Sequence, residues 1–128
     1  MTANPDPSNG REEILDLATL EELLSLDDGA TGLLLEMIGL FQEDGPQRLA
    51  QLKEACEAGD TQAAGEAAHA LKGAAGTLGA VELRAIAGEA ERLARLKEIP
   101  AILALIPNLE SSYPRFLAAL DGFVQERT

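Results

Sequence analysis

One histidine, His69, is the residue best suited to chemistry in this chain of 128 residues. It stands in residues 68–79 (AHALKGAAGTLG), a run built almost wholly of Ala, Gly and Leu. Lys72 follows three residues later, and side chains three apart on a helix are neighbours. An imidazole can act as a nucleophile, and an ammonium beside it can hydrogen-bond an anionic group. The pair therefore suits a phosphoryl group carried on nitrogen.

The element that must position His69 is a helix, predicted to run to about residue 78 with Asp60 as its N-cap and Gly79 as its end. Its apolar residues recur at spacings of three and four and form one stripe: Ala64, Ala68, Leu71, Ala75 and Leu78. At about 100° per residue, His69 lies about 140° from the centre of that stripe. We therefore expect the imidazole to point outward.

The outward face around His69 is predicted to be poor in side chains, because three glycines share it by helical phase. Each glycine costs about 1 kcal/mol relative to alanine in a helix interior. Their presence indicates that another molecule must come within contact distance of the imidazole. Gly73 is expected to leave this space open beside the imidazole. The expected border of a partner-binding surface comprises Gln62, Gly65, Glu66 and Gly76.

The same residues resemble the signature of histidine-containing phosphotransfer (HPt) domains of two-component phosphorelays. The segments that carry the resemblance are residues 68–73 (AHALKG) and 78–80 (LGA), then 41–49 (FQEDGPQRL) for the preceding long helix, Gly59-Asp60 for its break, and 90–93 (AERL) for the next helix. The resemblance covers roughly residues 16–124, nearly the whole chain.

The resemblance implies a phosphorelay intermediate that works on a four-helix bundle. Its histidine, here His69, would accept a phosphoryl group from a receiver-domain aspartyl phosphate and pass it to another response-regulator receiver. Lys72 would orient the phosphoryl oxygens and Gly73 would keep the approach open. The expected partners are receiver domains and a hybrid sensor histidine kinase. We expect no cofactor of its own, with Mg²⁺ held by the receiver, and no autokinase activity, since no ATP cradle is evident.

Composition agrees with an all-α fold. Hydrophobic residues make up 46% of the chain but aromatic residues only 3%, which favours a core of Leu, Ala and Ile between packed helices. The length fits one domain. We predict an antiparallel four-helix bundle with a short extra N-terminal helix over residues 14–128, preceded by a disordered tail over residues 1–13.

Helix boundaries follow from caps and breakers. Thr19 with Glu22 resembles a capping box that opens a short helix through Leu26. Thr31 is expected to cap a long helix that ends at Gly59. The last helix is predicted over about residues 100–123, bent or interrupted at Pro107.

Charge and cysteine content bear on the partners and the compartment of the protein. The formal charge of -12 argues against nucleic acid as a partner. Residues 60–98 hold five bases and six acids, so this part carries only -1 of that charge. Cys56 is the single cysteine and suggests a reducing compartment. No secretory signal is evident, and the apolar runs are too short to span a bilayer. We expect a cytoplasmic monomer that does not bind membranes.

Two other classes remain open at this point. The domain could be a non-phosphorylated adaptor that binds a receiver or a histidine kinase through the same helix face. It could also bind a cofactor such as haem through His69, although a single ligand on an outward, glycine-lined face disfavours this. A metal site has no support, because one histidine without a Cys/His cluster gives no ligand set.

Overall fold

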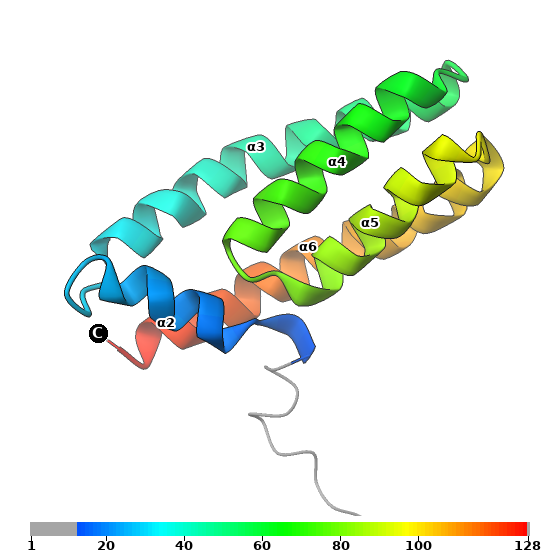
Figure 1. The fold of residues 1–128 in the computed structure, drawn as a ribbon. Coiled ribbons are helices and arrows are strands. Elements are labelled where there is room, and N and C mark those ends of the chain that lie inside the picture. Colours follow the sequence, from blue (N-terminus) through cyan, green and yellow to red (C-terminus); the bar gives the residue numbers. More distant parts are fainter. Residues whose placement is uncertain (1–12, 128) are drawn as a thin grey trace, which may run out of the picture.

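The computed structural model describes residues 13–127, and their named elements are all helices. In chain order these are α2 (Leu17–Ser25), α3 (Gly32–Glu57), α4 (Thr61–Thr77), α5 (Val81–Arg95) and α6 (Ile99–Gln125). The four long helices run up and down as a bundle, and the short α2 crosses one end (Figure 1). The predicted all-α bundle with an extra N-terminal helix is confirmed. The predicted tail over residues 1–13 lies, except for Glu13, outside the described residues.

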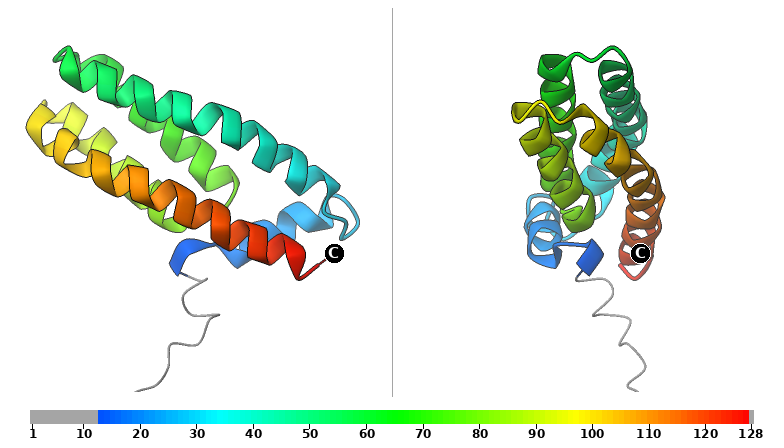
Figure 2. Two further views of the ribbon diagram at one scale, coloured as in Figure 1. Left: turned by 180° about the vertical axis from the view of Figure 1, so that it is seen from behind. Right: turned by 90° about the vertical axis from the view of Figure 1, so that its right-hand side faces the viewer.

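The bundle has two layers, with α4 and α5 in one and α3 and α6 in the other (Figure 2). The predicted apolar stripe of α4 lies in the interior between them: Ala64, Ala68, Leu71, Ala75 and Leu78 are all 2% exposed or less. Because most of these side chains are alanines, neighbouring helices can approach α4 closely. Larger core side chains come from the other helices, among them Leu52, Leu83, Leu109 and Phe116.

The two ends of α4 are fixed by residues that the sequence identifies. Asp60 is the N-cap, and its carboxylate accepts a hydrogen bond from the Ala63 N–H at 3.0 Å. Beyond the last turn, Gly79 has a φ of +71°, and a Cβ there would lie 3.0 Å from the carbonyl oxygen of Asp16. Both the left-handed backbone and the close approach require glycine. The α4–α5 turn is thereby tied to the start of α2, where the Asp16 N–H donates to the Gly79 carbonyl at 2.8 Å.

Two predicted caps differ in the structure. α2 is capped by Asp16, whose carboxylate accepts from the Thr19 N–H at 3.2 Å, so Thr19 is a capped residue and not the cap. Asp16 has the extended backbone that a capping side chain needs. Thr31 stands before α3, but its helical backbone leaves its side chain without a cap hydrogen bond. Asp27 accepts from the Leu33 N–H instead, at 3.0 Å.

Of the two outcomes predicted at Pro107, a bend or an interruption, the interruption is wrong, because α6 runs unbroken through both Pro107 and Pro114. Each internal proline removes one backbone hydrogen bond and costs about 3 kcal/mol. Large side chains on either side of these prolines are fully buried, and each contributes roughly 1.5–3 kcal/mol. Tertiary packing therefore holds the helix together. Within residues 13–127, no helix has the length and apolar character needed to cross a membrane.

Candidate functional site

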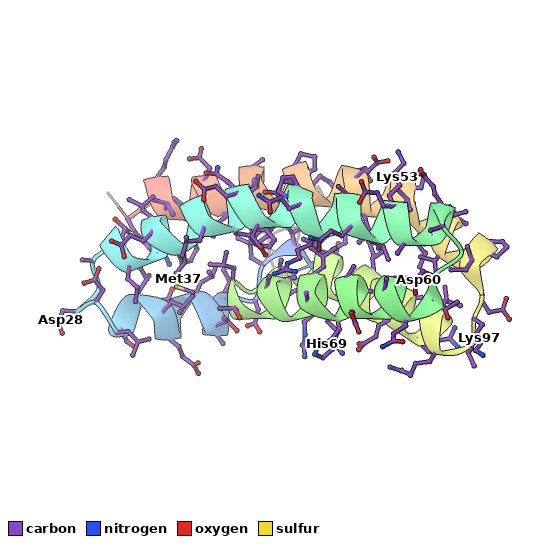
Figure 3. The ribbon with its side chains drawn as sticks, turned by 90° about the horizontal axis from the view of Figure 1, so that it is seen from above. Asp28, Met37, Lys53, Asp60, His69 and Lys97 are labelled. Carbon is purple, nitrogen blue, oxygen red and sulfur yellow. The ribbon has the colours of Figure 1, made fainter. Side chains whose placement is uncertain are left out.

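His69 projects from α4 into solvent, as its helical phase predicts. Its side chain is 69% exposed and points away from α3 when the bundle is seen from above (Figure 3). Among residues 13–127 it is the one histidine, and no group of three or more His, Cys, Asp or Glu side chains there could hold a metal ion. This face therefore presents one exposed imidazole and the side chains around it.

A carboxylate from the next helix holds the ring. The Nδ1 atom of His69 lies 2.8 Å from Oε2 of Glu91 on α5. The other oxygen, Oε1, accepts a hydrogen bond from Nζ of Lys72 at 2.6 Å. Arg95 adds a more distant ion pair, with NH1 3.9 Å from Oε2. The Glu91 side chain is only 16% exposed, so one partly buried anion joins the imidazole to two cations.

The charge state of Glu91 decides which nitrogen of His69 is free. The hydrogen bond from Lys72 is the main cause that lowers the pKa of Glu91; burial opposes this and the bond to His69 adds to it. The carboxylate is therefore ionised near neutral pH and can only accept hydrogen bonds. The proton between the two groups then belongs on Nδ1 of His69. This leaves the lone pair of Nε2 available on the exposed ring.

The three glycines around His69 differ in what surrounds their Cβ positions. A Cβ on Gly73 would have no atom within 4 Å, so the surface there is open. A Cβ on Gly65 would lie 3.5 Å from that of Ala94 on α5, and one on Gly76 would lie 3.3 Å from Cδ and Nε of Arg84. The Cβ position of Gly73 is therefore open, a Cβ on Gly76 would press on the Arg84 side chain, and one on Gly65 would make only an ordinary van der Waals contact with α5. Helical phase alone places all three glycines on one face and cannot separate these surroundings.

The four residues expected at the border of the partner-binding surface line two different grooves. Gln62, Gly65 and Glu66 line one shallow groove with His69, and Gln62 donates to Glu66 at 3.4 Å. Gly76 lines a second groove between α4 and α5, together with Lys72 and Gly73. Glu91 also lines the first groove, whereas the second is also lined by Gly79 and Ala80 of the α4–α5 turn.

A third groove lies on the flank of α4 that faces α3. It has a volume of about 490 Å³ and is mostly apolar. Its apolar lining comes from Met37, Leu40, Phe41, Ala74 and Leu78. Leu40 is 65% exposed, one of six exposed large hydrophobic side chains among residues 13–127.

Glu91 is the site residue that the sequence analysis missed. Glu91 lies within residues 90–93, one of the segments that carry the HPt resemblance, but nothing in the sequence indicates a role for it. It is 22 residues from His69, and only the packing of α5 against α4 brings the two side chains together. The sequence contains one indirect signal. Glu91 stands one helical turn before Arg95, on a helix that is expected to follow the histidine helix.

Comparisons with known proteins agree on one family. Residues 36–124 match the Hpt domain. The fold matches the crystal structure of histidine-containing phosphotransfer protein B from Pseudomonas aeruginosa PAO1, with 33% identity and a TM-score of 0.72. That match covers 88% of this chain and 93% of the other. A comparison with curated proteins gives no significant match.

Proposed function

Because the chain belongs to the Hpt domain family of phosphorelay proteins, we propose that His69 is the residue that carries the phosphoryl group. The observation that supports this most strongly is the contact between Glu91 and Nδ1, which leaves Nε2 as an exposed nucleophile. The proposed donor is an aspartyl phosphate of one receiver domain, and the proposed acceptor is the aspartate of another. A hybrid sensor histidine kinase is the proposed source of the first receiver.

The transfer step uses groups already in position on this chain. The lone pair of Nε2 attacks phosphorus as the P–O bond to the receiver aspartate breaks, and the bonding electrons return to that carboxylate. The proton on Nδ1 stays between His69 and Glu91. The receiver would supply Mg²⁺, and the reaction depends mainly on positioning and electrostatic stabilisation.

Lys72 and Gly73 are proposed to assist this step in different ways. The ammonium of Lys72 is paired with Glu91, and the flexible Lys72 side chain is one-third exposed. It can turn toward phosphoryl oxygens at Nε2, and a hydrogen bond between charged groups contributes roughly 1.5–3 kcal/mol. Gly73 would leave the receiver a path to the ring, since no atom lies where its Cβ would be.

We propose that the receiver docks on α4 and extends over the apolar groove toward α3. A specific protein interface covers about 800 Å² on each partner, which is wider than the surroundings of one imidazole. Leu40 is the exposed apolar residue of this groove, and such a side chain fits the centre of an interface. Gln62 and Glu66 would then lie at the polar rim beside His69.

Phosphotransfer with a purified receiver tests this function. Incubated with a phosphorylated receiver from the same organism and Mg²⁺, the protein is expected to gain an acid-labile, base-stable phosphate. His69→Gln is expected to abolish the label and to keep the helical circular dichroism spectrum, because the residue is exposed. Equal labelling of the variant would place the chemistry elsewhere. Receiver binding without any label on the wild type would favour the adaptor function.

A further inference from the structure

The contact between Glu91 and His69 supports an inference that rests on the proposed function and concerns the phosphorylated state. We propose that the charge of Glu91 keeps the proton on Nδ1 after a phosphoryl group is bound to Nε2, so that the phosphohistidine stays in its reactive, protonated form. Glu91 would thus be a positioning residue that acts through the ring.

The proton on Nδ1 determines how easily the N–P bond breaks. With the proton in place, the group that leaves phosphorus is a neutral imidazole. Without it, the leaving group is an imidazolate anion, which is a much poorer one. When the phosphoryl group moves to a receiver aspartate, the electrons of the N–P bond return to Nε2 and a P–O bond forms at the carboxylate. The proton remains on Nδ1 throughout, so the step needs no other acid.

The geometry favours this proton position. A phosphorylated ring that keeps its Nδ1 proton carries a positive charge, and an anionic oxygen of Glu91 lies 2.8 Å away. The phosphoryl group on Nε2 would lie across the ring from the carboxylate, so the two anions are separated. An opposite charge at this distance shifts a titration by one to three units, roughly. A glutamine at this position could accept the same hydrogen bond but would lack the charge.

The other charged groups near the ring support the charge of Glu91. Lys72 of α4 and Arg95 of α5 both pair with its carboxylate. Glu66 of α4 and Lys97, just after α5, line the groove that contains His69. If Lys72 turns toward an arriving phosphoryl group, Arg95 would still pair with Glu91 and keep its carboxylate ionised.

A titration of the phosphorylated protein tests the proposal without any receiver. The full chain is phosphorylated on His69 with phosphoramidate, and the ³¹P NMR shift is followed between pH 5 and 9. In Glu91→Gln the midpoint is expected at least about one pH unit below that of the wild type. Glu91→Asp, which keeps the charge, is expected to titrate above Glu91→Gln.

Glu89→Gln is the matched control, because it removes the same charge from the same helix. Glu89 pairs with Arg92, and helical phase turns it about 200° from Glu91. It is expected to titrate like the wild type. The proposal is overturned if Glu91→Gln keeps the wild-type midpoint, or if Glu89→Gln lowers it equally.

Transfer to a receiver gives a second readout. Glu91→Gln is expected to donate its phosphoryl group about tenfold more slowly at pH 8, and to recover most of the wild-type rate near pH 6. A purely structural defect would not be rescued by acid, so a uniform loss across this range contradicts the proposal. If no receiver takes phosphate from the wild type, the proposed function fails, while the titration still decides the role of Glu91.

Discussion

A single carboxylate determines how His69 is presented to its surroundings. Glu91 binds Nδ1 and leaves Nε2 facing solvent, while Lys72 fixes the other carboxylate oxygen. The outward direction of the imidazole follows from helical phase and was predicted from sequence. The hydrogen bond to Glu91 was not, because it joins two helices whose relative rotation depends on the packing of the whole bundle.

Substitutions at Gly73 test whether a receiver needs open space beside His69, and they separate the effect on folding stability from the effect on phosphoryl transfer. Gly73→Ala is expected to raise the free energy of unfolding by up to about 1 kcal/mol, because its Cβ meets no atom and alanine favours the helix. Gly73→Leu is expected to fold equally well but to accept phosphate from a receiver at least about tenfold more slowly, because its side chain obstructs the approach.

Urea unfolding and the rate of label transfer measure the two effects separately. A wild-type transfer rate in Gly73→Leu would show that a receiver does not pass over this position. Loss of stability in Gly73→Ala would mean that the site is more crowded than the structure shows.

Side chains of α3 and α6 pack against each other beside two internal prolines, Pro46 of α3 and Pro114 of α6. The hydroxyl of Tyr113 on α6 donates to the Phe41 carbonyl at 3.1 Å, in the turn of α3 that precedes Pro46. The two rings pack with centroids 5.4 Å apart. Gly45 provides the space, since a Cβ there would lie 2.6 Å from Cε2 of Tyr113. This contact joins α3 to α6 close to both prolines and adds to the packing that holds the two helices together.

Gly45→Ala is expected to destabilise the protein by about 1–3 kcal/mol, because the added methyl group overlaps the Tyr113 ring. Gly39 on the same helix is the control, since a Cβ there meets nothing within 4 Å. Gly39→Ala is expected to be neutral or stabilising. Denaturant midpoints measure both variants, and equal shifts in the same direction would contradict this account of the α3–α6 contact.

The sequence predicts the helices, their order and the buried stripe of α4, because these depend on local periodicity. Asp60 and Gly79 were also predictable as the ends of α4, since capping and left-handed backbone depend on residue type. The sequence left open whether the last helix bends or breaks at Pro107, because the proline penalty is local whereas the compensating burial is tertiary. The surroundings of Gly65 and Gly76 were not predictable either, because their contacts with α5 depend on tertiary packing and not on the helical phase of α4.

At the scale of the whole molecule, the proposed function uses one side of the bundle. The layer of α4 and α5 carries His69. It lies within residues 60–98, which hold five of the ten bases and are nearly neutral within a total charge of -12. A phosphoryl group adds up to two negative charges, and this placement limits repulsion from the rest of the protein. The apolar groove between α3 and α4 adjoins this side, whereas α6 lies in the other layer.

Two exposed leucines test where a receiver docks. Leu40→Glu, in the groove, is expected to weaken receiver binding at least about tenfold, because a buried anion replaces an apolar contact. Leu103→Glu on α6, also at an exposed leucine, is expected to leave the affinity unchanged. Calorimetric titration with one receiver measures both. Equal weakening by the two variants would remove the groove from the interface.

The most direct test of the central claim is to identify the atom that carries the phosphoryl group. The protein, labelled with ¹⁵N in its histidine, is phosphorylated by a receiver and analysed by NMR for coupling between ³¹P and each ring nitrogen. The account predicts coupling to Nε2 of His69, with Nδ1 still bound to its proton. Phosphate on Nδ1, or on a carboxylate elsewhere in the chain, would contradict it.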